Sequence, residues 1–138
     1  MIIDANNLIL GRLSSFVAKK ALLGEKIEIV NCENCIITGD KPVIFAKYDR
    51  FVKMGTHEKG PFIHRMPHKL VKRTIRGMMP YKTEKGRAAF KSIKCHIGVP
   101  ENLKNEKFES IKNASAEKVP NLRYIKIIEV CRYIGAKI

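Results

Sequence analysis

The side chains with the clearest chemical potential in this sequence are cations repeated at helical spacing. Lys69, Lys72, Arg73 and Arg76 recur at intervals of three and four residues, which predicts one cationic helix face. A face that is merely solvated usually mixes Lys with Glu, because opposite charges one turn apart relieve repulsion. A face of like charges repels itself unless a polyanion neutralises it. The pattern therefore indicates binding to phosphate groups.

Two further segments carry the same kind of charge. Lys47, Arg50 and Lys53 are predicted to share one arc of a helix that begins after residue 40, and Arg87 and Lys91 stand one helical turn apart. Each phosphate that such cations neutralise releases condensed counterions, so binding to nucleic acid should weaken steeply with salt. The side chains that we expect to contact the nucleic acid are Arg12, Lys47, Arg50, Lys53, Lys59, Arg65, His68, Lys69, Lys72, Arg73, Arg76, Tyr81, Lys82, Lys85, Arg87 and Lys91.

The positive charge is concentrated in the middle of the chain. Of a net charge of +14, residues 41–96 contribute +12, from fifteen Lys or Arg and three Asp or Glu. Residues 1–40 have a net charge of −1, and residues 97–138 have +3. Net charge informs about partners rather than about fold. We therefore predict that residues 41–96 form the surface that faces the nucleic acid.

Aromatic residues and a long loop favour RNA over DNA as the partner. Phe62 and Tyr81 are predicted to lie in loops, where they could stack on unpaired bases, whereas Tyr48 belongs to an apolar helix face. Gly and Pro residues interrupt residues 54–67, and a basic loop of this length suits irregular folded RNA. We find no spacing typical of a helix-turn-helix, a zinc-finger repeat or a basic zipper.

The cysteines raise the question of a metal or redox site. Cys32 and Cys35 form a CxxC pair, but a structural zinc site needs four ligands, and the sequence holds no second pair of this kind. Cys95 and His96 could complete a set only if folding happened to bring them close. We expect buried apolar thiols here and no metal site.

Catalysis has little support in the residue types that are present. Asp49, Glu58 and Glu84 are the only carboxylates of residues 41–96, and no two are spaced for acid–base work. The segment that begins at Gly11 lacks the further glycines of a dinucleotide site and the Lys of a phosphate-binding loop. We therefore expect no catalytic residue, no cofactor and no small-molecule substrate. An RNA-modifying enzyme and a free RNA-binding translational regulator remain the alternatives.

The elements that must position these residues indicate an α/β fold in a single domain, residues 1–138. A strand at residues 2–3, a helix from Gly11 to about Gly24 and a strand at 26–31 make a βαβ unit, which implies a parallel sheet. Further helices are predicted after Asp40, from His68 and after Thr83, with strands at 94–98 and 124–128 and a short last helix. The apolar faces of these three helices are predicted to be, in order, Ile44, Tyr48, Phe51 and Val52; Leu70, Val71, Thr74, Ile75 and Met78; and Ala89, Phe90 and Ile93. Residues 101–121 are polar and are predicted to form a surface excursion.

The N-terminal residues lack the basic and apolar regions of a signal peptide, and no apolar run approaches the length of a membrane span. Four cysteines in 138 residues are sparse for a secreted scaffold. The expected location is therefore the cytoplasm, with no membrane partner.

Several segments together resemble the family of large-subunit ribosomal protein thirteen. The opening of that family resembles GRLSS at 11–15, VAK at 17–19, LLG at 22–24 and VN at 30–31 of this chain. The central signature of the family resembles IRGMMP at 75–80. The segments KTEKGRAA at 82–89 and GVP at 98–100 resemble the archaeal and eukaryotic branch. The order and spacing of these segments carry the likeness, which covers residues 1–100 well and the tail more loosely.

The resemblance implies a three-layer α/β/α fold around a parallel sheet of about four strands, with a basic loop and helix extension. It also implies a structural role in the large ribosomal subunit, with large-subunit ribosomal RNA and neighbouring ribosomal proteins as partners and a contribution to subunit assembly. The RNA-facing segments of the family correspond to residues 65–76 and 81–91.

Overall fold

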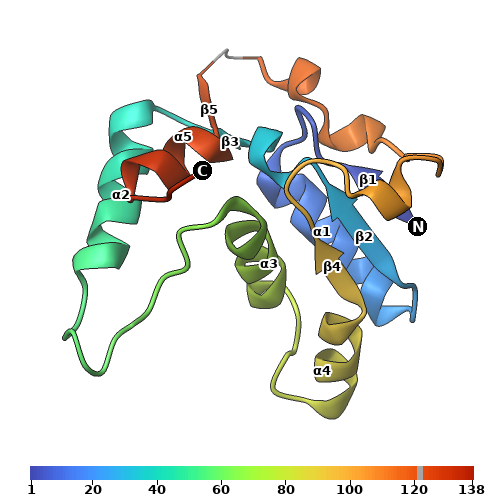
Figure 1. Ribbon diagram of the computed structural model, residues 1–138, viewed down its shortest axis with the longest axis horizontal. Helices are drawn as coiled ribbons and strands as arrows, with labels where there is room; N and C mark the ends of the chain where they lie inside the picture. The colour runs from blue at the N-terminus through green and yellow to red at the C-terminus, as the bar shows by residue number, and fades with distance from the viewer. Residues whose placement is uncertain (121–122) are drawn as a thin grey trace.

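The computed structural model describes residues 1–120 and 123–138 of this chain (Figure 1). Its central sheet has three parallel strands, β1 (Ile2–Asp4), β2 (Ile27–Val30) and β4 (Ile93–Cys95), in the order β1-β2-β4. Ile29 of β2 lies opposite Ile3 on one side and opposite Cys95 on the other. Buried β-branched residues dominate these short strands, as expected for a parallel sheet whose faces are covered.

Helix α1 (Leu10–Leu22) makes the crossover from β1 to β2 and confirms the predicted βαβ unit. Leu13, Val17 and Ala21 recur at helical spacing and are buried, so this face joins the core. Gly24 follows with a φ of +98°, a conformation that ends the helix and that residues with a Cβ rarely adopt.

The prediction of a fourth strand in the parallel sheet is wrong. The strand expected at residues 124–128 is β5 (Tyr124–Lys126), and it pairs antiparallel with β3 (Ile36–Thr38) in a separate two-stranded sheet. Asn31, with a φ of 55°, and a 3-10 turn at Cys32–Asn34 redirect the chain after β2. The turn brings β3 alongside the C-terminal segment instead of the central sheet. The fold is thus mixed α/β.

The antiparallel pair supports a second, small apolar cluster. Ile44 of α2 (Lys41–Lys53) packs with Ile125 and with Val130 of α5 (Ile127–Tyr133). The rings of Phe45 and Tyr133 stack with centroids 4.4 Å apart, which ties the same two helices together. Val52, predicted to share the apolar face of α2, is exposed instead. The helix itself begins and ends close to the predicted residues.

Helix α3 (Pro67–Gly77) lies between α2 and the central sheet in the view of Figure 1, and α4 (Glu84–Lys91) lies at the bottom of that view, below β4. Leu70, Val71 and Ile75 of α3 are buried in the main core, as the sequence pattern predicted. Thr83 is the N-cap of α4, and its hydroxyl accepts a hydrogen bond from the backbone N–H of Gly86 at 3.2 Å.

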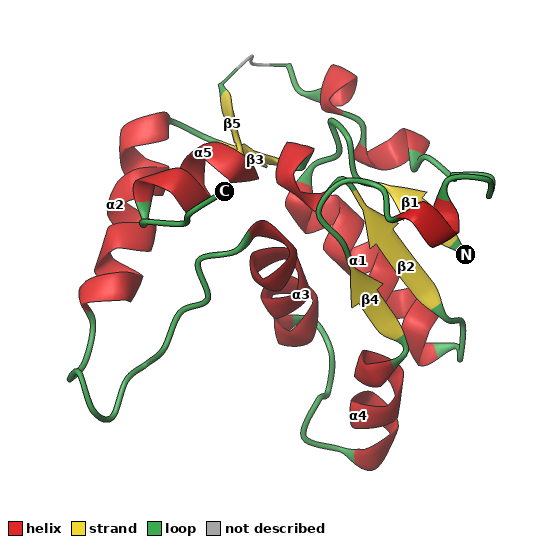
Figure 2. Ribbon diagram, viewed as in Figure 1, coloured by secondary structure: helices red, strands yellow, loops and turns green. Residues whose placement is uncertain are grey.

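A long loop joins α2 to α3, as predicted (Figure 2). Residues 54–66, all within the described part of the chain, form neither a helix nor a named strand. The connection from α3 to α4 extends to the same lower side of the view. The cationic segments of residues 41–96 therefore fall on one continuous stretch of α2, loop, α3 and α4.

The segment 101–121 does more than cover the surface. Its described part contains three 3-10 turns, Glu101–Leu103, Lys112–Ala114 and Ala116–Lys118. Glu109 exchanges backbone hydrogen bonds with β1, donating to the Ile2 carbonyl at 2.9 Å and accepting from the N–H of Asp4 at 3.2 Å. Ala114 is fully buried. The prediction of a purely surface excursion is therefore incomplete, because polar composition did not reveal these backbone contacts. Residues 121 and 122 lie outside the described residues.

Candidate nucleic-acid interface

The outer side of α3 presents the four cations that the helical spacing predicted. Lys69 and Arg76 are exposed, whereas Lys72 and Arg73 are half-buried. The opposite side of the helix is anchored in the core, so the backbone that carries these cations is fixed. A fixed row of cations can meet phosphates with little loss of conformational freedom on binding.

The four cations line a hollow between α3, α4 and the α2–α3 loop. Its volume is about 330 Å³, and we refer to it as the α3 hollow. Its lining consists of Phe62 and His64 from the loop, Lys69, Lys72, Arg73 and Arg76 from α3, and Phe90 from α4. Cations and aromatic rings thus meet in one concavity, a combination suited to phosphates and bases.

Cation–π contacts hold three of these cations in place. Lys72 Nζ lies 5.0 Å from the ring centre of Phe90, and the guanidinium of Arg76 lies 5.1 Å from that of Tyr81. The guanidinium of Arg73 lies 5.9 Å from the ring of Phe51 on α2. A ring orients a cation without neutralising it, so the charge stays available to an anion.

A second hollow on the α2 side of α3 shares Arg73 with the first. It has a volume of about 220 Å³, and its lining includes Lys47, Tyr48 and Arg73. Burial raises the pKa of Tyr48, whose ring packs against the core. Tyr48 is therefore a packing residue, in agreement with its predicted place on the apolar face of α2.

Within the described part of the chain, almost none of the candidate cations has an ion-pair partner. Among the residues that the structure describes, Lys53 is the only candidate with an ion pair, at 2.7 Å from Asp49. That hydrogen bond raises the pKa of Lys53. The exposed candidate cations without a carboxylate partner in the described residues are Arg12, Lys47, Arg50, Lys59, Arg65, Lys69, Arg76, Lys82, Lys85, Arg87 and Lys91. An uncompensated surface of this kind matches the expectation from the sequence.

Two predicted contact residues are engaged elsewhere. Arg12 donates to the carbonyl of Asn113 at 3.2 Å and lines a different hollow, between α1 and residues 109–114. Arg65 donates to the carbonyl of Gly135 at 3.5 Å, so it links the loop to the chain after α5. Both side chains stabilise the fold in this way, which the sequence did not indicate.

His68 is weakly suited to bind a phosphate. Burial, followed by the neighbouring Lys69, lowers the pKa of His68 and favours the uncharged imidazole. Its Nδ1 is buried and has no hydrogen-bond partner within the described residues. His64 and Phe90, by contrast, line the α3 hollow although neither was among the predicted contacts. The position of His64 in the basic loop could have indicated that it faces the hollow. The helical spacing, however, predicted that Phe90 lies on the inner face of α4.

The cysteines serve packing. Cys32 and Cys35 are buried free thiols, and burial raises the pKa of Cys35 to about 12. No cluster of His, Cys, Asp and Glu in the described ranges could hold a metal ion. No helix of those ranges is long and apolar enough to span a membrane.

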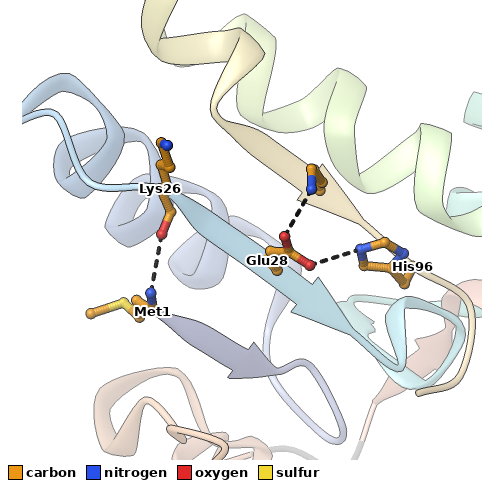
Figure 3. A network of polar contacts seen from close by, with 5 residues as sticks. Met1, Lys26, Glu28 and His96 are labelled. Atoms are coloured by element: carbon orange, nitrogen blue, oxygen red, sulfur yellow. Dashed lines mark hydrogen bonds and ion pairs between the residues drawn. The ribbon is translucent and has the colours of Figure 1, made fainter. Parts of the chain in front are cut away.

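A polar network on the central sheet holds the one carboxylate of β2 (Figure 3). Glu28 lies 3.0 Å from Lys94 Nζ and 3.3 Å from His96 Nε2, both of them on or next to β4. The hydrogen bond from Lys94 lowers the pKa of Glu28. Where β1 and β2 begin, the ammonium group of Met1 donates to the carbonyl of Lys26 at 3.1 Å. The network joins neighbouring strands across the sheet.

Comparison with known proteins gives the family. The model of the family described as ribosomal protein L13 matches residues 1–102, which is most of the chain. This chain belongs to that family. The resemblance deduced from the segments at 11–31 and 75–100 is thereby confirmed.

Relatives extend the match to nearly the whole chain. A protein of Archaeoglobus fulgidus named large ribosomal subunit protein uL13 is 46% identical over 97% of this chain and 86% of its own length. Proteins of the same name are 42% identical in Methanococcoides burtonii, over 99% of this chain and 98% of that protein, and 36% identical in Natronomonas pharaonis, over 100% and 92%. These relatives are archaeal, as the segments at 82–89 and 98–100 indicated.

Proposed function

We propose that this protein is a structural constituent of the large ribosomal subunit that binds large-subunit ribosomal RNA through residues 41–96 and supports subunit assembly. The observation that carries the proposal is the core-anchored row of uncompensated cations on α3, beside two aromatic side chains. The relatives are named as large-subunit proteins, which supports the same role. A ribosomal protein of this family is not an enzyme and works in the cytoplasm.

The chemistry of binding is charge neutralisation by a rigid surface. Cations on α2, the loop, α3 and α4 replace the counterions of RNA phosphates, and the released ions supply much of the free energy of binding. The single domain contributes its central sheet and α1 as the scaffold, because α3 packs directly on both. Arg guanidinium groups can also fork onto a phosphate or stack on a base.

The candidate contacts form two groups in this proposal. The central group lines the α3 hollow and consists of Lys69, Lys72, Arg73 and Arg76. The outer group extends the basic surface along the chain and consists of Lys47, Arg50, Lys53, Lys59, Tyr81, Lys82, Lys85, Arg87 and Lys91. Arg12, Arg65 and His68 are further candidate contacts outside these two groups. Neighbouring ribosomal proteins are further partners in this proposal, and no small-molecule substrate is part of it.

Sedimentation of native lysate at low and high salt tests the proposed role. Mass spectrometry follows this chain through the gradient. We expect it to migrate with large subunits and to stay there at moderate salt, because many phosphate contacts are embedded in folded RNA. A chain found mostly at the top of the gradient would contradict the proposal and support a free translational regulator instead.

A further inference from the structure

Phe62 is an apolar side chain that the protein leaves largely uncovered. It exposes 72% of its surface, although it lies in the hollow that the four cations of α3 line. Packing within the chain does not account for this position, because an uncovered ring gains little from burial. A large exposed apolar side chain inside a concavity is typical of a binding site.

The loop holds the Phe62 ring in a defined place. The backbone N–H of Gly60 donates to the carbonyl of Thr56 at 3.0 Å, and the N–H of Lys59 donates to the Thr56 hydroxyl at 3.2 Å. Gly60 has a φ of +77°, and a Cβ there would lie 2.9 Å from the Phe62 nitrogen and 3.0 Å from its ring. The ring therefore rests against the α-carbon of Gly60, where only glycine fits.

Cations stand beside this ring on the facing helix. Lys69, Arg73 and Arg76 of α3 line the same hollow and have no ion-pair partner among the residues that the structure describes. Lys72 is held over Phe90, so that ring is already occupied on one face. Phe62 is thus the aromatic surface of the hollow that remains open for stacking.

An aromatic ring and cations in one hollow match the two parts of an unpaired nucleotide. A base that is not paired offers its flat face to the ring, and its phosphates reach the cations. A base inside a duplex is stacked on its neighbours and cannot enter the hollow. A volume of about 330 Å³ falls within the range of sites that take small organic groups.

We infer that the α3 hollow binds an unpaired nucleotide of RNA, with the base stacked on Phe62 and the adjacent phosphates held by Lys69, Arg73 and Arg76. The inference rests on the proposed function and narrows it, because it assigns one part of the interface to single-stranded or bulged RNA. The outer cations then contact the phosphates of flanking helices without regard to base pairing.

The test compares the affinities of the full chain for octa-adenylate and for a fully paired RNA duplex, both followed by fluorescence anisotropy. Phe62→Ala should weaken octa-adenylate binding by about fivefold or more, since base–aromatic stacking contributes that much or more. The same variant should leave duplex binding within about twofold, and Phe62→Tyr should restore octa-adenylate binding. Phe108→Ala removes another exposed phenylalanine, outside residues 41–96, and should change neither affinity.

Three results would overturn the inference while sparing the proposed function. Unchanged octa-adenylate binding by Phe62→Ala would assign the ring to another partner, such as a neighbouring protein. Equal weakening of both RNAs would show that the ring only supports the loop. Displacement of octa-adenylate by micromolar adenosine monophosphate would overturn it too, since the ligand would then be a free nucleotide.

A charge variant distinguishes failure of the inference about Phe62 from failure of the whole proposed interface. Lys69→Ala combined with Arg76→Ala should weaken the binding of both RNAs, because it removes phosphate contacts that base pairing does not affect. If this variant binds both RNAs like the unaltered chain, the proposed interface fails whatever Phe62 does.

Discussion

Replacing Arg73 and Arg76 with alanine should flatten the salt dependence of RNA binding. Each phosphate contact contributes about 0.9 to the slope of log affinity against log salt on a duplex and about 0.7 on a single strand. Loss of two contacts therefore lowers the slope by about 1.4 to 1.8. Between about 50 and 200 mM salt, the affinity of the variant should fall roughly 7- to 12-fold less than that of the unaltered chain.

The same substitutions have a structural cost that must be measured separately. Arg73 lies 5.9 Å from the ring of Phe51 and Arg76 lies 5.1 Å from that of Tyr81. The loss of both contacts should lower the free energy of unfolding by about 1–2 kcal/mol and the Tm by a few degrees. Unfolding should stay cooperative, with helicity retained at room temperature in circular dichroism.

The assay is fluorescence anisotropy with a structured RNA at five salt concentrations, and Lys104→Ala with Lys107→Ala is the matched control. These two lysines are exposed in the segment after β4, outside residues 41–96. The control should lose little slope, although it removes the same amount of charge. A slope that is unchanged in the Arg variant, or equally lowered in the control, would refute the assignment of contacts to α3.

Three further predictions concern the scaffold. Ile75→Ala should destabilise the protein by about 2–5 kcal/mol in urea unfolding, because Ile75 is fully buried beneath the cations of α3; a loss below about 1 kcal/mol would mean that α3 is not anchored there. Thr83→Ala should cost about 1 kcal/mol and Thr83→Ser much less, since only the hydroxyl caps Gly86; equal losses would exclude the cap. Glu28 has a folded pKa below its ordinary value of 4.5, so its contribution to stability is present above that pH and is lost as the pH falls through the folded pKa. Lys94→Ala should reduce this loss in acid unfolding, and an unchanged acid profile would contradict the pairing.

The helices were predictable from sequence because their signals are local. The apolar stripe of α3 and the cap at Thr83 lie within one or two turns, and both match the structure. The same holds for the cationic face of α3, since three- and four-residue spacing decides which side chains are neighbours. These local patterns were enough to place the central group of candidate contacts in one hollow.

The strand pairing and the hollow depend on contacts between distant segments. Nothing near β5 in sequence shows that it pairs with β3, some ninety residues earlier, instead of with the central sheet. Phe90 was assigned inward by its spacing, yet it lines the α3 hollow because the loop and α3 approach α4 in the fold. Arg12 and Arg65 stay predicted contacts, and their bonds to the carbonyls of Asn113 and Gly135 are visible only in three dimensions.

The most direct test of the central claim is ultraviolet cross-linking of ribosomal RNA to protein in purified large subunits, with mass spectrometry of the cross-linked peptides. We expect the cross-links of this chain to fall within residues 41–96 and to include Phe62 or its neighbours around the α3 hollow. Cross-links confined to residues 1–40 and 97–138 would contradict the claim, because RNA would then contact the scaffold and leave the cationic surface unused.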